Sequence, residues 1–212
     1  MADQPSPPEK SKYRRRRKDL GNNVAFRISQ LQDRFAVADP NTIATLARLR
    51  RTSHTPGDVF DSAEVLELPP SLIGWVDDEQ PSDSEWASHT ALTLYARHQQ
   101  SRSDQPMHRD WGHSFGSAMR ELATTAQSEQ AIYRRFAAIG TASSYEELTY
   151  HVRTAIALLR EHAISLDYGL FADDLYTFRQ PRGPQKLRGI WGRDYYRASS
   201  KNARDAKEKT PS

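Results

Sequence analysis

The chain has 212 residues, of which 37% are hydrophobic and 27% are charged, so it has room for one domain with a core built from amphipathic elements. No segment approaches the ~20 consecutive apolar residues of a membrane-spanning helix, and no apolar secretory signal follows the charged N-terminus. The absence of cysteine excludes disulfides, thiol catalysis and thiolate zinc sites. It also fits the cytoplasmic location that we expect.

The net charge of +3 hides an uneven distribution along the chain. Residues 1–18 hold seven Lys and Arg, and residues 179–209 hold ten. Residues 58–85 hold nine acidic residues and no Lys or Arg. A polyanion could therefore meet strongly positive surfaces although the whole chain is nearly neutral.

The two ends of the chain differ in composition from its middle. Residues 1–19 combine prolines, small polar residues and a charge block, which predicts a disordered basic tail. Residues 201–212 are charged and lack large apolar side chains, so we expect a disordered or frayed tail there. Residues 20–200 are predicted to form one folded domain.

Apolar residues recur at helical spacing through most of that domain, from Ile28 to Tyr195. Asp39 before Pro40 predicts one helix start, Ser144 with Glu147 forms a capping-box pattern, and Asp167 is a predicted N-cap. The acidic stretch 58–85 contains several prolines and a glycine, which predict loop with short helical pieces. No useful segment alternates with period two, so the predicted fold class is all-α, a compact multi-helix bundle.

The segment Gly112-His113-Ser114-Phe115-Gly116 matches the G-x-S-x-G nucleophile elbow of α/β-hydrolases. The elbow requires a strand that delivers the serine into a strained turn. The polar residues that precede it do not predict a strand, so a helix N-cap at Ser114 is favoured over a hydrolase.

Other chemistry-bearing patterns are weak. His108, Asp110 and His113 could approach one metal ion, but no H-E-x-x-H pattern occurs, and surface or loop histidines are favoured. Asp173 and Asp174 are adjacent, so on a helix they point about 100° apart and do not form an acid/base pair. We therefore predict no catalytic residue, no metal and no cofactor.

Arginines and lysines on helices are the remaining signal. Guanidinium groups on a rigid helix bind phosphates, and counterion release supplies affinity that does not depend on sequence. Trp191, Tyr195 and Tyr196 interleave with the C-terminal charges and could stack unpaired bases, although Trp191 fits the core better. The candidate nucleic-acid-binding residues are Arg50, Arg51, Arg134, Arg135, Arg182, Lys186, Arg188, Arg193 and Arg197.

An ordered set of short segments resembles the CasB family, the small subunit of the type I-E CRISPR surveillance complex Cascade. The resemblance runs from Leu46 to Tyr196 and is carried by Leu46-Ala47-Arg48-Leu49-Arg50-Arg51, Leu94-Tyr95-Ala96-Arg97-His98-Gln99-Gln100-Ser101, Met107-His108, Ser114-Phe115-Gly116-Ser117-Ala118-Met119-Arg120, Ile164-Ser165-Leu166-Asp167-Tyr168, Leu175-Tyr176 and Trp191-Gly192-Arg193-Asp194-Tyr195-Tyr196.

The resemblance implies an all-helical, non-enzymatic subunit that acts in antiviral defence. Its implied partners are other Cascade subunits, CRISPR RNA, a second copy of the chain and the single-stranded non-target strand of target DNA. It would stabilise the R-loop by holding that displaced strand. Members often have an arginine where this chain has Ser117, so one basic contact is missing here. The alternative is a free-standing helical DNA-binding regulator, for which no recognition helix is evident.

Overall fold

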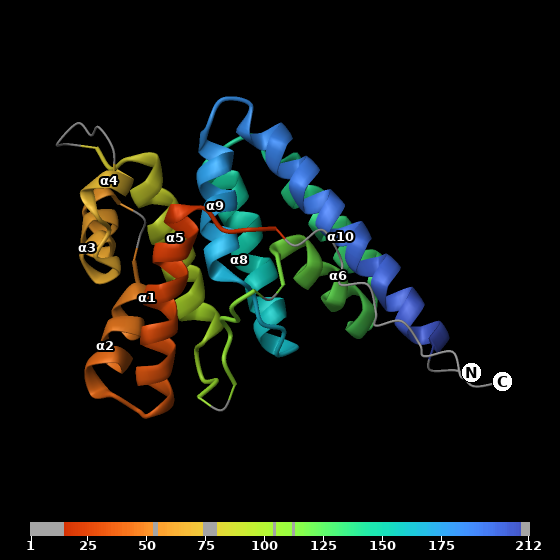
Figure 1. Ribbon diagram of the computed structural model, residues 1–212, viewed down its shortest axis with the longest axis horizontal. Helices are drawn as coiled ribbons and strands as arrows, with labels where there is room; N and C mark the ends of the chain where they lie inside the picture. Colours follow the sequence, from red (N-terminus) through yellow and green to blue (C-terminus); the bar gives the residue numbers. More distant parts are fainter. Residues whose placement is uncertain (1–14, 53–54, 74–79, 104, 112, 209–212) are drawn as a thin grey trace, which may run out of the picture.

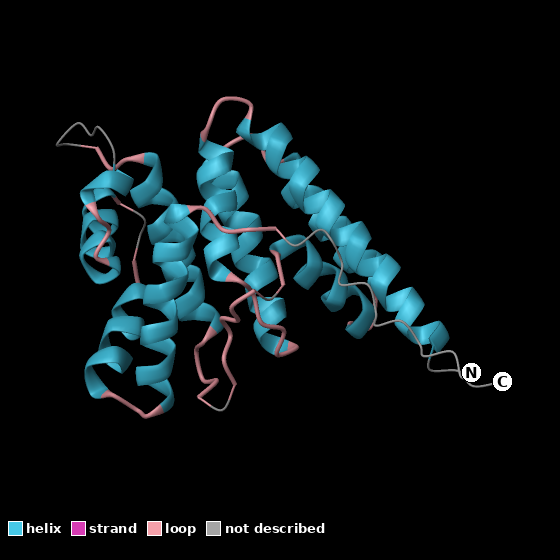
Figure 2. Cartoon of the chain, in the orientation of Figure 1, coloured by secondary structure: helices cyan, strands magenta, loops and turns pink. Residues whose placement is uncertain are grey.

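The computed structural model describes residues 15–52, 55–73, 80–103, 105–111 and 113–208, with side chains up to residue 198. Within these ranges the fold is all-α, as predicted, and the only extended pairing is an isolated bridge between His108 and Leu166 (Figure 2). The helices are α1 (Asp19–Ala36), α2 (Pro40–Leu49), α3 (Pro56–Leu66), α4 (Pro70–Ile73), α5 (Asp83–His98), α6 (Phe115–Thr125), α7 (Glu129–Thr141), α8 (Tyr145–Glu161), α9 (Tyr168–Arg179) and α10 (Gly183–Glu208). None of these helices combines the length and apolarity needed to cross a bilayer.

The helices are arranged around α5, α8 and α9. α5 packs against α9, α8 and α3, while α10 packs against α6, α9 and α7. In Figure 1, α2, α3 and α4 lie at one end of the long axis, and α10 runs along the other end. The arrangement leaves α2 and α10 far apart on the molecule.

α5 is the central helix of the bundle. Every residue from 87 to 96 is buried, so the helix is enclosed on all sides and not only on the single apolar face that its spacing predicts. Its alanines, Ser88, Thr90 and Thr93 are small enough to let neighbouring helices approach from each direction. Tyr95 packs edge-on against Tyr168 of α9, with ring centroids 5.4 Å apart.

The predicted helix starts are confirmed by their caps. The Asp39 carboxylate accepts the Thr42 amide at 2.7 Å, and Asp167 accepts the Leu170 amide at 3.0 Å. Ser144 accepts the Glu147 amide at 3.1 Å, but Glu147 returns its bond to the amide of Ser143, so the box is shifted by one residue.

The prediction for the acidic stretch was wrong in one part. α3 spans 11 residues, which is more than a short helical piece. Thr55 and Asp58 form a complete capping box, and Pro56 occupies the first helical turn. The helix-start signals at Thr55, Pro56 and Asp58 lie before Pro69 and Pro70, on which the loop prediction rested, so the helix forms before those prolines can end it. The loop predicted at Gly74 lies outside the described residues.

The predicted N-terminal tail includes residues that belong to the folded domain. Arg15 pairs with Asp174 and Asp194, and its Nη1 lies 3.1 Å from the Oδ2 atom of each carboxylate. Arg17 bonds Asp167 twice at 2.8 Å. The ordered contacts therefore begin before the predicted boundary at residue 19, whereas residues 1–14 lie outside the described ranges. At the other end, α10 continues past the predicted boundary at 200 to Glu208.

α9 caps α1 from across the bundle. The two carboxylate oxygens of Asp173 accept the amides of Lys18 at 2.7 Å and Gly21 at 3.0 Å, two of the free donors at the start of α1. A Cβ atom at Gly21 would lie within 3 Å of Asp173 and of the Gly169 carbonyl oxygen. Glycine at 21 therefore permits the close approach of α1 and α9.

Candidate nucleic-acid interface

The end of α2 carries a cluster of positive charges that three helices share. Arg50 and Arg51 follow Leu49, and Arg97 of α5 donates from Nη2 to the Arg50 carbonyl at 2.6 Å. Partial burial, followed by the charges of Arg153 on α8 and of Arg50, lowers the pKa of Arg97. Partial burial and then Arg51 likewise lower the pKa of Arg50. The surroundings thus disfavour these cations, and an anion placed among them would relieve that penalty.

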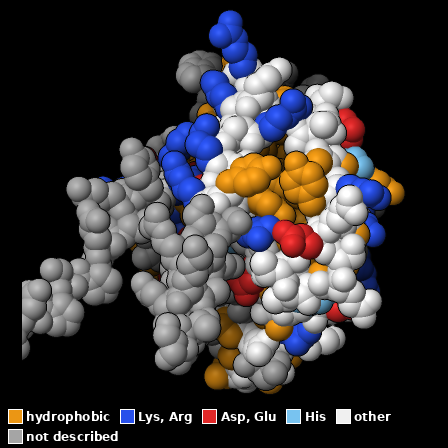
Figure 3. Space-filling model, turned by 90° about the vertical axis from the view of Figure 1, so that its right-hand side faces the viewer, with side chains coloured by type: hydrophobic (Ala, Val, Ile, Leu, Met, Phe, Trp, Pro, Cys, Tyr) orange, Lys and Arg blue, Asp and Glu red, His pale blue; other side chains and the backbone are white. Residues whose placement is uncertain are grey.

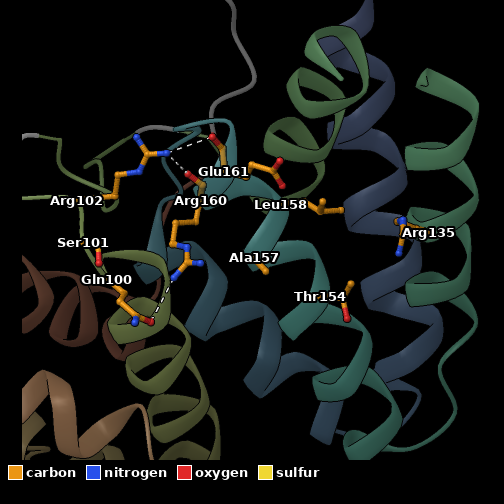
Figure 4. Close-up of a pocket in the computed structure, with 9 residues that line it drawn as sticks. All are labelled: Gln100, Ser101, Arg102, Arg135, Thr154, Ala157, Leu158, Arg160 and Glu161. Atoms are coloured by element: carbon orange, nitrogen blue, oxygen red, sulfur yellow. Dashed lines mark hydrogen bonds between the residues drawn. The ribbon is translucent and has the colours of Figure 1, made fainter. Parts of the chain in front are cut away.

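The positive charge continues along α8 to an open cleft of about 690 Å³ (Figure 4). Arg160 lies seven residues after Arg153, on the same side of the helix. Arg102 donates from Nη2 to the carbonyls of Arg160 at 2.8 Å and Glu161 at 3.2 Å, at the negative end of the helix dipole. Arg135 of α7 lines the opposite wall of this cleft.

The remaining predicted residues form a second group on α7, α10 and the turn before it. Arg134, Lys186, Arg188, Arg193 and Arg197 are exposed, and so is Arg182, which has a φ of 59°. Arg188 donates from Nε to the Gly140 carbonyl near the end of α7. Because α2 and α10 lie at opposite ends of the molecule in Figure 1, the nine predicted residues form two separate groups.

Carboxylates do not neutralise most of the predicted residues. Among the described residues, no ion pair to Asp or Glu involves Arg50, Arg51, Arg134, Arg135, Arg182, Lys186, Arg188 or Arg193. The ion pairs among the described residues instead involve arginines that stabilise the fold, such as Arg15, Arg17 and Arg120. These eight residues therefore keep their charge available to an external anion.

Sequence reasoning missed four arginines of the cluster and the cleft, which are Arg97, Arg102, Arg153 and Arg160. The seven-residue spacing of Arg153 and Arg160 was the one signal that could have found two of them. Arg97 has no such signal, because its neighbours come from two other helices.

The predicted aromatic contacts are only partly accessible. Trp191 and Tyr195 are each 2% exposed and belong to the core, as expected for Trp191. Tyr196 is 60% exposed and remains available for stacking.

The described geometry gives Ser114 the position of a helix cap. Its Oγ accepts the Ser117 amide at 3.4 Å and lies 3.1 Å from the Ser117 hydroxyl. His113 pairs through Nδ1 with Glu121 at 3.1 Å. His108 contacts Asp110 at 3.3 Å. Each histidine therefore pairs with a different carboxylate, and neither is placed to activate the serine as a general base would.

Comparison with known proteins places this architecture in one family. The model of the CRISPR-associated protein Cse2 matches residues 45–196, which is most of the folded domain. The chain belongs to the Cse2 family. The Cse2 match begins within α2 and runs to Tyr196 of α10, and it includes the arginine cluster, the α8 cleft and the exposed α10 residues up to Arg193.

Two solved structures resemble this Cse2-family chain. CasB from Thermobifida fusca is 38% identical and has a TM-score of 0.69, with 85% of this chain and 99% of that chain covered. A chain of a structure titled "CRISPR RNA-guided surveillance complex" is 17% identical, with a TM-score of 0.66 and coverage of 88% and 99%, and shows the same fold. None of the curated proteins compared with the chain matches it.

Proposed function

We propose that this Cse2-family chain is a non-catalytic subunit of a CRISPR RNA-guided surveillance complex that holds a displaced DNA single strand. The observation that carries the proposal is the cluster of Arg50, Arg51 and Arg97, where like charges gather without a carboxylate partner among the described residues. Such a cluster is unfavourable alone and becomes favourable when phosphates lie across it.

The strand bound is proposed to be the non-target strand of an R-loop. R-loop formation exchanges one duplex for another of nearly equal stability, so a few phosphate contacts on the displaced strand decide whether it persists. The structure titled as a surveillance complex contains a chain of the same fold, which supports an assembly with guide RNA and other subunits. A second copy of the chain beside the first would extend the positive surface along the strand.

The test is a double Arg50→Ala, Arg51→Ala variant, measured in a reconstituted complex and as the isolated chain. Both side chains lie at a helix end and make no side-chain ion pair with a described carboxylate, so the variant is expected to melt like the wild type. Removing two phosphate contacts should reduce the slope of log Kd against log salt by about 1.4 for single-stranded DNA. R-loop lifetime should shorten in parallel.

The matched control removes the same charge elsewhere, as Arg16→Ala, Arg34→Ala, because both arginines are exposed and lie outside the cluster. An R-loop lifetime unchanged in the Arg50, Arg51 variant would remove that pair from the interface. Tighter binding of duplex than of single-stranded DNA by the isolated chain would favour the regulator alternative and overturn the proposal.

A further inference from the structure

A groove of about 260 Å³ opens between α7 and α10. Four aromatic side chains line it, from Tyr133, Phe136, Trp191 and Tyr196. Figure 3 shows a hydrophobic patch exposed on the side of the molecule where α10 lies, with Lys and Arg side chains beside it. An exposed aromatic surface of this kind indicates a binding site.

The exposed rings of this groove are held in place. Tyr196 is 60% exposed and Tyr133 is 44% exposed. A hydrogen bond between the Tyr196 and Tyr133 hydroxyls raises the pKa of Tyr196, so the two side chains are tied together. Tyr195 packs edge-on against Tyr196 at 5.6 Å and stacks on Phe136 at 4.7 Å, which anchors the pair to the core. Rings fixed before binding lose little entropy when a partner arrives.

Gly192 keeps the groove open. It lies inside α10, where glycine is less favourable than alanine. A Cβ atom at this position would meet nothing within 4 Å, so close packing of helices does not require the glycine. Any larger side chain at residue 192 would enter the groove that Gly192 lines.

The charge on the α10 side of the groove is positive, and Glu129, which lies near Tyr133 and Tyr196, is paired with Arg120. Arg188 lines it, and Arg193 and Arg197 are exposed on the same helix. Between residues 183 and 198 the only acidic residue is Asp194, which is buried and paired with Arg15. The groove therefore suits a partner that combines a flat apolar group with negative charge.

We infer that this groove binds an unpaired nucleobase of a single strand whose phosphates lie along the arginines of α10. The inference rests on the proposed function, since it names a second way in which the same strand is held. Aromatic platforms beside a cationic surface bind single strands by stacking, whatever the base. The volume is slightly below the ~300–1,000 Å³ of pockets for whole small molecules, which fits one ring system.

The experiment compares two single strands of equal length, one with normal bases and one abasic, so that both present the same phosphates. The wild-type full chain should bind the normal strand about fivefold more tightly or better, as expected for one stacked base. The fluorescence of a 2-aminopurine base in the strand should be quenched when the strand binds. Tyr196→Ala and Gly192→Leu should both abolish the affinity difference and the quenching, while retaining the abasic affinity.

The matched control is Phe60→Ala, which removes an exposed aromatic side chain from the acidic helix α3. It should leave both affinities unchanged. Gly192→Leu should melt at the wild-type temperature or above it, because leucine favours a helix more than glycine does. Loss of quenching in a protein that melts normally therefore reports a blocked groove.

The failures of the two proposals are distinguishable. Equal wild-type affinity for normal and abasic strands would overturn the nucleobase inference and leave strand binding intact. Unchanged quenching in Gly192→Leu would also overturn the nucleobase inference. Groove variants that bind DNA normally but fail to assemble with other subunits would overturn it as well, since a protein would then occupy the groove. Absence of binding to either strand, alone and in the assembled complex, would overturn the proposed function as well.

Discussion

The ion pairs of Arg15 give a prediction whose magnitude can be worked from the structure. Arg15 bonds Asp174 through both terminal nitrogens and Asp194 through one, and its side chain is 24% exposed. The Asp174 side chain is 1% exposed and keeps one other bond, from Trp191 Nε1 at 2.7 Å. Arg15→Ala would leave a buried carboxylate without its cation.

Breaking a buried ion pair from one side costs about 3–5 kcal/mol in free energy of unfolding. Because a quarter of the Arg15 side chain is exposed, water can partly replace it, and we expect the lower end, about 3 kcal/mol near neutral pH. For a chain of 212 residues this corresponds to a Tm lower by about 6–12 °C. Urea unfolding followed by circular dichroism measures the free energy directly.

The loss should depend on pH in a defined direction. Burial raises the pKa of Asp174, and Arg15 opposes that rise, so the pKa increases further in Arg15→Ala. A carboxyl whose folded pKa lies above its unfolded value costs stability as the pH rises through the folded pKa. The difference in unfolding free energy between Arg15→Ala and the wild type should therefore be smallest at about pH 4 and reach its full size at higher pH.

Two further variants make the reasoning refutable. Adding Asp174→Asn should recover much of the loss, because the amide oxygen still accepts the Trp191 bond and carries no charge. Arg16→Ala removes an exposed neighbour and should change stability by less than about 0.5 kcal/mol. A pH-independent gap, or one below about 1 kcal/mol, would show that Arg15 does not compensate a buried charge.

Three more predictions follow from individual contacts. Gly21→Ala should destabilise the fold by about 2 kcal/mol or more, because the added carbon overlaps Asp173 and the backbone of α9, and a normal melting curve would refute this close approach. Burial lowers the pKa of His98 to about 3, so the native state should lose up to about 1.4 kcal/mol per pH unit as the pH falls below 6.5, and His98→Gln should flatten that slope in urea titrations. Arg97→Ala should lower the salt slope of single-strand binding by about 0.7, whereas an unchanged slope would exclude Arg97 from phosphate contact.

The sequence was a good guide to elements that local signals determine. Asp39, Ser144 and Asp167 start helices because a side-chain oxygen satisfies free amides a few residues ahead, and that relation is visible in the sequence. The same logic would have predicted α3 from Thr55, Pro56 and Asp58. The enclosed position of α5 was not predictable in this way, since burial on all sides depends on which helices surround it.

The charge clusters show where sequence reasoning stops. Arg15 and Arg17 look like part of a tail because their buried acidic partners, Asp174 and Asp167, lie 150 or more positions away. Arg50 and Arg51 were found because they are adjacent, but Arg97 and Arg153 join them only through the packing of helices. A run of like charges is therefore an incomplete guide, because folding neutralises some members and adds others.

The contacts of the N-terminal segment have a consequence for synthesis on the ribosome. Arg15 and Arg17 are translated 150 or more residues before their partners Asp167, Asp174 and Asp194. α1 also waits for Asp173 to bind the amides at its start. The first helix thus cannot reach its final packing co-translationally, and nascent chains that stall before α9 should remain open to proteases at their beginning.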